Sequence, residues 1–442
     1  MSTEIINAFR NAPGNYHIGW GDGEYTNWQD EQMSWKKTCY IGDWTFLWNL
    51  LIEGPEALKL LSDISVNSLA KFDMGQAKHV IQCNEDGKVI AEGILMRLGE
   101  EKFVVQSTPA FYTGYKLHTG TYNAKAWQGD WFKYQIQGPN ALYVVEKATG
   151  ESIRDIGFMR FRKTHIKGRE IITLRQGMAG EIGYELQGPG EYAQEIYDAI
   201  LEAGKDYGIK RLGRRTVMIN HLEACYPTAS WHYLGAAVGK GLPGYREYVA
   251  KNFNISWVST KIGGSFQGND ISDYFRSPVE MGWTKNIKFD HNFIGRKALE
   301  AEVANPKRTI VTLEFNSDDV IDIYASIFRE GGAYDFMDIP HQEKWVLWAD
   351  QVMKNGKLVG VSTVPGYSYY FRKVLSLTYI DVEISEAGTK VVIVWGSPGT
   401  PQKHIRATVA PAPYKKDNRR IDVSKLPSYL KNKGVRPTQL TE

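Results

Sequence analysis

The pattern of apolar and polar positions predicts a chain that combines sheets with helices. Three short apolar runs between residues 80 and 106 are separated by polar turns, which is typical of antiparallel strands in a meander. Residues 191–203 repeat apolar side chains on one helical face, and Gly204 follows where such a helix is expected to end. Strands and helices in this order favour an α+β fold.

A strand-rich section begins at residue 308. Three apolar runs between residues 357 and 395 are separated by turns, and they predict a small barrel or sandwich. We place a boundary near Pro306, so that residues 1–305 form two intertwined α+β domains and residues 306–442 form a β-rich barrel domain. A length of 442 residues agrees with about three domains.

A short sequence recurs in the first half of the chain. Residues 52–58 and 136–142 both read Ile-x-Gly-Pro-x-Ala-Leu. Each copy follows an apolar run and precedes helical residues, with the proline near the first turn of the helix, where its missing N–H costs nothing. The repeat predicts two similar strand-to-helix corners.

Another unit covers residues 281–301. Its first part, residues 281–289, has the composition of a strand, and a polar turn follows at Asp290-His291-Asn292. A helix is expected to start near Lys297. The pattern therefore predicts a strand, a turn and a helix.

Composition and charge limit the possible partners. The chain has 53 Lys and Arg against 50 Asp and Glu, and the net charge of +3 is too small to indicate nucleic-acid binding. No run approaches the ~20 apolar residues of a membrane-spanning helix, and the N-terminus lacks the apolar core of a signal peptide. An odd number of cysteines, 3, argues against a disulfide framework. We expect a cytoplasmic protein, monomeric or weakly oligomeric, with no membrane or nucleic-acid partner.

Several catalytic motifs are missing from the sequence. Residues 235–241 resemble a phosphate-binding loop, but the spacing is one residue short and Gly241 stands where Ser or Thr would bind magnesium. There is no HExxH and no pair of histidines at metal-ligand spacing on a helix, so we expect no metal site. The absence of Gly-x-Ser-x-Gly argues against an esterase, and the absence of a strand-linked GxGxxG argues against a nicotinamide or flavin enzyme.

Three segments carry a resemblance to a known family. Residues 278–299 hold a Pro and Glu pair, Gly-Trp, an acidic turn and Phe-Ile-Gly-Arg-x-Ala-Leu. Residues 180–185 read Gly-Glu-Ile-Gly-Tyr-Glu, and residues 212–224 combine Leu-Gly-Arg-Arg with Leu-Glu-Ala. With these motifs the chain resembles the T-protein family, the aminomethyltransferases of glycine cleavage. The resemblance implies a three-domain cloverleaf with mixed antiparallel sheets and a C-terminal β-barrel-like domain.

The resemblance also implies tetrahydrofolate as the cofactor. Within the family the sequence most resembles the tetrahydrofolate-dependent aryl O-demethylases of the vanillate and syringate type, for example at residues 262–266 and 288–291. We therefore expect a methyl group to move from a methoxylated aromatic compound, chlorinated ones included, to tetrahydrofolate, giving 5-methyltetrahydrofolate and a phenol. Two alternatives stay open: methylene transfer from a methylenedioxyphenyl compound giving 5,10-methylenetetrahydrofolate, and a non-catalytic folate-binding protein.

Five residues are implied at the cofactor site. Glu185 is expected to accept hydrogen bonds from the pterin amino and ring N–H groups, and Tyr184 to pack on a ring face, although the same alternation is typical of a half-exposed strand. Glu92 occupies the place of the family's catalytic-site aspartate and is expected to orient the cofactor's amine or take its proton. Arg215 and Glu223 are further cofactor-binding candidates, with a surface salt bridge and a surface or capping glutamate as the alternatives.

The substrate pocket is expected to be more apolar than in the vanillate enzymes. An aromatic segment replaces their histidine-containing segment, and single residues replace their carboxylate-binding arginine and their catalytic tyrosine: Trp44, Phe46, Leu47 and Trp48, then Ser107, then Val217. A bulkier or more apolar ring, such as a chlorinated methoxybenzoate or a methylenedioxyphenyl lignan, would fit such a pocket.

A proton donor is expected near the leaving oxygen. A free phenol has a pKa of about 10, so a phenoxide leaving group gains from a group that donates a proton or a hydrogen bond. His232 and Tyr233 are the first candidates, and His17, expected beside the substrate, is the second. A hydrogen-bonded structural residue is the alternative for each histidine.

Overall fold

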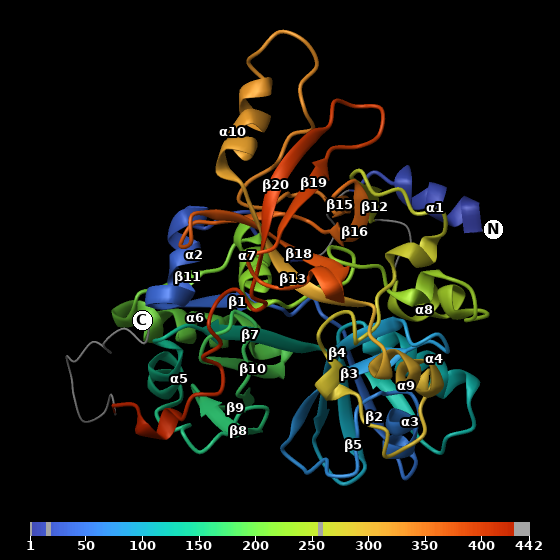
Figure 1. The fold of residues 1–442 in the computed structure, drawn as a ribbon. Helices are drawn as coiled ribbons and strands as arrows, with labels where there is room; N and C mark the ends of the chain where they lie inside the picture. Colours follow the sequence, from blue (N-terminus) through green and yellow to red (C-terminus); the bar gives the residue numbers. More distant parts are fainter. Residues whose placement is uncertain (1, 15–18, 255–259, 428–442) are drawn as a thin grey trace.

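Sheets carry most of the architecture in the computed structural model, which describes residues 2–14, 19–254 and 260–427. Within these residues the strands form a six-stranded, a five-stranded and a seven-stranded sheet and one two-stranded pair. The three large sheets mark three lobes, with the seven-stranded sheet above the other two in the view of Figure 1.

The six-stranded sheet has mixed strand directions. Its spatial order is β11 (Ile209–Arg211), β1 (Cys39–Asp43), β7 (Trp131–Gln137), β10 (Gly183–Pro189), β9 (Arg169–Leu174) and β8 (Phe161–Ile166). Strand β1 runs parallel to β11 and antiparallel to β7. One face packs in a buried apolar cluster with α5 (Ala141–Thr149) and α6 (Ala193–Gly204), which is the amphipathic helix that the sequence predicted.

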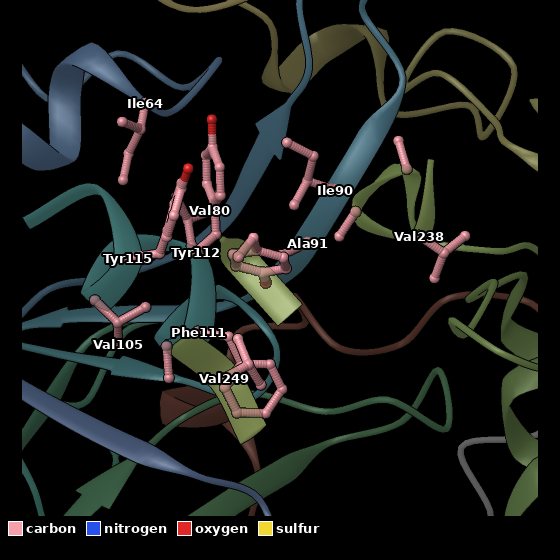
Figure 2. Close-up of a cluster of buried hydrophobic side chains, with 14 of the residues drawn as sticks. Ile64, Val80, Ile90, Ala91, Val105, Phe111, Tyr112, Tyr115, Val238 and Val249 are labelled. Carbon is pink, nitrogen blue, oxygen red and sulfur yellow. The ribbon is translucent and has the colours of Figure 1, made fainter. Parts of the chain in front are cut away.

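The five-stranded sheet is antiparallel throughout. Its order is β3 (Ala77–Cys83), β4 (Val89–Arg97), β5 (Lys102–Gln106), β2 (Asn49–Glu53) and β6 (Lys125–Gln128), so the predicted meander is confirmed. Helices α3 (Ala57–Asp63), α4 (Pro109–Thr119) and α8 (Tyr245–Phe253) pack on one face. Figure 2 shows how side chains from the sheet and from these helices meet there, among them Val80, Val105, Phe111, Tyr112 and Val249. Burying one such side chain fully contributes roughly 1.5–3 kcal/mol.

The seven-stranded sheet closes into a barrel. Six strands follow one another in the order β13 (Arg308–Phe315), β20 (Lys403–Ala410), β19 (Lys390–Trp395), β15 (Asp350–Lys354), β16 (Lys357–Ser362) and β18 (Lys373–Asp381), and β18 pairs again with β13. Strand β17 (Gly366–Ser368) is added beside β18. Closure leaves the six strands without unpaired edges. The expected barrel is confirmed.

Further α-helices and one strand pair lie outside the three large sheets. In the described residues these are α1 (Ser2–Arg10), α2 (Trp28–Lys37), α7 (Arg214–Ala224), α9 (Arg296–Ala304), α10 (Ser317–Ser326), and β12 (Lys261–Gly263) with β14 (Val346–Trp348). Helix α7 contacts α2 and the barrel strands β17 and β18, so it lies where the lobes meet. No helix in the described part of the chain is long and apolar enough to cross a membrane. The domain boundary near Pro306 falls between α9 and β13 and stays a prediction.

The repeated Gly-Pro sequence forms the two expected corners. Gly54 lies between β2 and α3 with φ +145°, and Gly138 lies between β7 and α5 with φ +131°. A Cβ atom on Gly138 would lie 2.5 Å from the carbonyl oxygen of Thr38, and one on Gly54 would lie 2.7 Å from Cα of Ala124. Both corners therefore require a residue without a side chain.

The strand expected at residues 281–289 is wrong. Turns and a short 3₁₀ helix, Thr284–Asn286, occupy this segment, and Gly282 has a φ of +74°, which interrupts any extended run. Met281 and Ile287 are buried all the same. Burial alone produced the apolar pattern, because a looped segment buries such side chains without pairing to another strand. The helix that follows, α9, is confirmed.

Candidate functional site

The six-stranded and five-stranded sheets face each other across a buried polar region. On β7 the apolar side chains pack into the cluster under α5 and α6, so the alternate residues point towards the other sheet. Such alternation normally marks a strand with one face in water. Here that face is buried too, with exposed fractions of 1%, 1% and 0% for Lys133, Gln135 and Gln137.

Glu185 on β10 is the carboxylate of this region. Its Oε2 accepts hydrogen bonds from Gln176 Nε2 at 2.6 Å and Gln135 Nε2 at 3.2 Å, and its Oε1 accepts one from Gln187 Nε2. Burial raises the pKa of Glu185 above its ordinary value, and Lys133 and the three amides oppose part of that rise. A carboxylate accepts about four hydrogen bonds, so Glu185 retains capacity for a ligand.

A chain of side-chain amides connects Glu185 with a buried lysine. Gln187 Oε1 accepts a hydrogen bond from Gln106 Nε2 on β5 at 2.7 Å, and the same amide nitrogen lies 3.0 Å from Asn49 Oδ1 on β2. Asn49 Oδ1 also accepts from Lys133 Nζ at 3.1 Å. An acidic and a basic group are thus joined through neutral side chains supplied by both sheets.

Lys133 is the basic end of this chain. Its Nζ donates to the carbonyl oxygen of Leu47 at 2.6 Å, in the aromatic segment that precedes β2. Burial lowers the pKa of Lys133 from 10.5 to about 7, with Glu185 and Asp43 countering part of the shift. At neutral pH the amine is therefore close to the midpoint of its titration.

A second polar group surrounds Glu92 on β4. Its Oε2 accepts a hydrogen bond from the Tyr226 hydroxyl at 2.8 Å and lies 2.8 Å from His79 Nε2. Asn286 Nδ2 lies 3.2 Å from His79 Nδ1, which makes Nδ1 the acceptor and Nε2–H the donor to Glu92. Within the described residues Oε1 of Glu92 has no hydrogen-bond partner, and the residue is 8% exposed. One oxygen is held and the other is left for a ligand.

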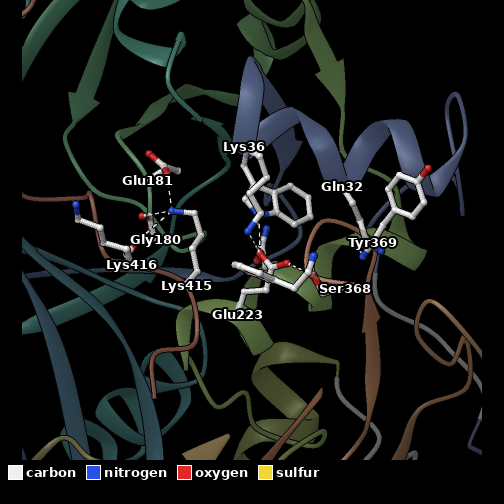
Figure 3. Close-up of polar contacts among 12 residues, drawn as sticks. Gln32, Lys36, Gly180, Glu181, Glu223, Ser368, Tyr369, Lys415 and Lys416 are labelled. Carbon is white, nitrogen blue, oxygen red and sulfur yellow. Dashed lines mark hydrogen bonds and ion pairs between the residues drawn. The ribbon is translucent and has the colours of Figure 1, made fainter. Parts of the chain in front are cut away.

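Glu223 belongs to a third polar group, which Figure 3 shows. Its carboxylate accepts hydrogen bonds from Trp35 Nε1 at 2.9 Å and Ser368 Oγ at 2.6 Å, and it forms an ion pair with Lys36. The side chains of the ion pair are 0% and 1% exposed. Protein groups therefore occupy both oxygens, and Glu223 joins α2, α7 and β17. These contacts do not support the cofactor-binding role that we expected.

Two more cofactor candidates have other surroundings than expected. Tyr184 is buried in the apolar cluster under α5 and α6, on the opposite face of β10 from Glu185, so it does not lie beside that carboxylate. Arg215 donates to the carbonyl oxygen of Ile339 at 2.6 Å and pairs with Asp338 at 3.3 Å. These contacts correspond to the alternative, a salt bridge at the edge of the lobes.

The two proton-donor candidates in the described residues, His232 and Tyr233, are both buried. The backbone N–H of Thr228 donates to Nδ1 of His232 at 2.9 Å, so the proton of this imidazole is on Nε2. Burial lowers the pKa of His232 to about 3. Neither His232 Nε2 nor the Tyr233 hydroxyl has a hydrogen-bond partner among the described residues. Burial raises the pKa of Tyr233, and the charge of Glu92 adds to the rise. His17 lies outside the described residues.

The described substrate candidates lie at two apolar clusters. Trp44 and Val217 are buried in the apolar cluster where the lobes meet, and Phe46 and Leu47 pack against it. Trp48 contacts Phe111 on α4 with ring centroids 4.7 Å apart. Ser107, the residue after β5, donates its backbone N–H to the carbonyl oxygen of Trp48 at 3.0 Å, so it lies beside the aromatic segment. One cluster thus contains Trp44, Phe46, Leu47 and Val217, whereas Trp48 and Ser107 belong to the other side of the aromatic segment.

Sequence reasoning missed most partners of the two carboxylates. Around Glu92 it missed His79 and Tyr226, which are far away in the chain. Around Glu185 it missed the buried glutamines and Lys133. Their polar alternation on β7 was present in the sequence, but it has the same form as a strand with one face in water.

Comparison with known proteins places the chain near two groups of relatives. A family model described as the GCVT N-terminal domain matches residues 9–232. The chain is 32% identical to the syringate O-demethylase of Sphingobium sp. (strain NBRC 103272 / SYK-6), over 88% of this chain and 89% of that protein. It is 33% identical to the sesamin methylene transferase of Sinomonas sp. (strain No.22), over 91% of this chain and 93% of that protein.

The chain belongs to the GCVT family. A solved GCVT structure, the glycine cleavage system aminomethyltransferase T from Bartonella henselae, matches 95% of this chain and 98% of that chain with a TM-score of 0.67 at 17% identity. This match confirms the expected α+β T-protein fold. Tetrahydrofolate, the cofactor that the sequence implied, is the cofactor of this GCVT protein.

The buried polar groups of this GCVT protein fit that cofactor. A reduced pterin carries amino and ring N–H donors, and Glu185 is a buried acceptor with capacity left. The open oxygen of Glu92 is a second acceptor, suited to an amine. His232 and Tyr233 add buried donors that have no partner among the described residues. Acceptors and donors of both kinds are thus available inside the protein.

Lys133→Met is expected to flatten the pH dependence of stability above neutral pH. Below about pH 7 the amine is protonated in both states, so the cost of burying the cation is at its full size. Between about 7 and 10.5 the unfolded chain keeps a proton that the folded chain has released, so the wild type gains stability as the pH rises. The gain approaches about 1.4 kcal/mol per pH unit.

Denaturant unfolding at about pH 7 and about pH 9 measures this slope. Lys163→Met, which removes an exposed lysine from β8, is the matched control and is expected to keep the slope of the wild type. Equal slopes in the wild type and Lys133→Met would show that the buried amine does not titrate in this range.

Proposed function

We propose that the protein transfers a methyl group from a methoxylated aromatic compound to tetrahydrofolate, giving 5-methyltetrahydrofolate and a phenol. The observation that carries the proposal is the 32% identity to a syringate O-demethylase over 88% of the chain, together with two separately held buried carboxylates. The apolar neighbourhood of Trp44 and Val217 suits a flat aromatic ring.

Glu185 holds the pterin in this proposal. Its carboxylate accepts hydrogen bonds from the ring edge, and the surrounding amides fix its position in the absence of ligand. Charge-assisted hydrogen bonds of this kind are roughly twice as strong as neutral ones. The cofactor, when bound, supplies the secondary amine that accepts the one-carbon unit.

Glu92 handles the proton of that amine. Tyr226 and His79 hold one oxygen of its carboxylate, so the other keeps a defined direction towards the ligand. The methyl–oxygen bond breaks with its electron pair left on oxygen, and the amine loses a proton as it gains the methyl group. The hydrogen bond from the Tyr226 hydroxyl to Glu92 supports a role for Tyr226 in positioning this carboxylate. His232 and Tyr233 are further candidate donors to the phenoxide.

Methylene transfer is the second candidate. The relative from Sinomonas is named a sesamin methylene transferase, and it matches this chain at 33% identity over 91% of its length. Ser107 and Val217 are small or apolar side chains, as a bulky methylenedioxyphenyl ring would require. The product would then be 5,10-methylenetetrahydrofolate and a catechol.

A turnover assay tests both candidates. Purified protein with tetrahydrofolate and a panel of methoxyarenes is expected to form 5-methyltetrahydrofolate, with many products per protein molecule, as read by mass spectrometry of the folate. Methylenedioxyarenes in the same panel report on the second candidate through the mass of 5,10-methylenetetrahydrofolate. A panel that yields neither product would leave only a non-catalytic folate-binding protein.

Glu185→Gln is expected to weaken tetrahydrofolate binding by about tenfold to a hundredfold, because it replaces a charged acceptor by a neutral amide of the same shape. Glu185→Ala is expected to weaken it at least as much. Calorimetric titration of tetrahydrofolate measures both. The control is Glu170→Gln, on an exposed position of the neighbouring strand β9. Unchanged affinity in the Glu185 variants would remove this residue from the pterin site.

Glu92→Gln is expected to lower kcat by about 10²- to 10⁴-fold, because an amide cannot take the proton of the amine. Tetrahydrofolate affinity is expected to change little, since Tyr226 can still donate to the amide oxygen. Glu100→Gln, in the exposed turn between β4 and β5, is the control. A variant with the turnover of the wild type would exclude Glu92 from proton transfer.

A further inference from the structure

The described part of the chain buries three lysines, and they are paired differently. Lys36 and Lys415 each form an ion pair with a buried glutamate. Lys133, 1% exposed, instead donates to neutral oxygens, those of Leu47 and Asn49, and no carboxylate of the described residues forms an ion pair with it. Lys133 therefore differs from the others in lacking an anionic partner.

An ammonium group in this position is costly without an anion. Buried charges are normally paired, because the solvation lost on burial is not recovered from neutral acceptors. Glu185 is joined to Lys133 by hydrogen bonds through amides and forms no ion pair with it, although its charge opposes part of the lowering of the Lys133 pKa. An ammonium group has three N–H donors, of which two are used by protein oxygens. One N–H donor is left for a ligand, and an anionic ligand would favour the protonated form of the amine.

The position of Lys133 indicates which ligand. The carbonyl oxygen that it binds belongs to Leu47, inside the aromatic segment, and Asn49 is the next residue but one. The backbone N–H of Ser107 donates to the carbonyl oxygen of Trp48. Lys133 is thus bound to the backbone of the aromatic segment that we expect to bind the ring, at the opposite end of the amide chain from Glu185.

We propose that Lys133 binds an anionic oxygen of the aromatic ligand and so determines which rings the site accepts. The oxygen is either a ring carboxylate of the substrate or the phenoxide that is left when the methyl–oxygen bond breaks. In the second case the electron pair stays on oxygen, and the ammonium group stabilises it by a hydrogen bond and its charge. This inference rests on the proposed function and adds a specificity-determining residue to it.

Two matched rings test the inference. We expect 3,4-dimethoxybenzoate to bind Lys133→Met at least about tenfold more weakly than the wild type, a loss of about 1.4 kcal/mol, whereas 1,2-dimethoxybenzene binds both within about twofold. Lys133→Gln, which keeps a hydrogen-bond donor for Leu47, gives the same comparison if Lys133→Met does not fold. Lys133→Arg keeps the charge and is expected to retain the preference for the carboxylate. Lys163→Met on the surface is the control.

Turnover distinguishes the two sources of the anion. If the anion is the phenoxide, both rings bind the variants normally, but kcat falls more steeply in Lys133→Met than in the wild type as the pKa of the released phenol rises. A variant with unchanged binding and an unchanged dependence on the leaving group would overturn the inference. Loss of tetrahydrofolate affinity alone would overturn it too, since Lys133 would then serve the cofactor. If the wild type turns over no methoxyarene, the proposed function fails instead.

Discussion

The burial of Glu185 between two sheets is the constraint on which the rest of the site depends. A carboxylate in that position is tolerated only if hydrogen-bond donors surround it, and Gln135, Gln176 and Gln187 provide them. Their amides must come from several strands, so the six-stranded sheet has to present its polar face inwards. The five-stranded sheet covers that face with Gln106 and completes the enclosure. The amides that stabilise the buried carboxylate of Glu185 in the absence of a ligand therefore also leave part of its hydrogen-bonding capacity free for one.

Three buried glutamates show how surroundings decide the role of one residue type. Both oxygens of Glu223 are taken by protein donors, including the ammonium group of Lys36, so it stabilises the junction of the lobes. Removing one partner of such a buried pair typically costs about 3–5 kcal/mol. Glu185 is satisfied by neutral amides that leave part of its capacity free. Glu92 has one oxygen held by Tyr226 and His79 and the other without a partner among the described residues, which suits the proton transfer that we propose for it.

The C-terminal segment forms a further buried ion pair, which connects two lobes. Lys415, which follows the last barrel strand, forms an ion pair with Glu181 and donates to the carbonyl oxygen of Gly180 at 3.0 Å, as Figure 3 shows. Glu181 lies four residues before Glu185 in the sequence, so this contact connects the barrel to the loop that leads into β10. The barrel therefore supports the segment that carries Glu185, although it supplies no residue to the amide chain.

The sequence by itself determined the local elements: the meander, helix α6, the two glycine corners and the strands of the barrel follow from period, turn residues and Gly-Pro. The family motifs indicated Glu92, Glu185, Glu223 and Arg215 as candidates alike. The resemblance alone could not show that the last two are held by other protein groups. Only the tertiary structure decided that Lys133, Gln135 and Gln137 are buried and not exposed to water, and that His79 and Tyr226 reach Glu92. The physical reason is that alternation records which side chains share a face, whereas burial of that face depends on residues distant in the chain.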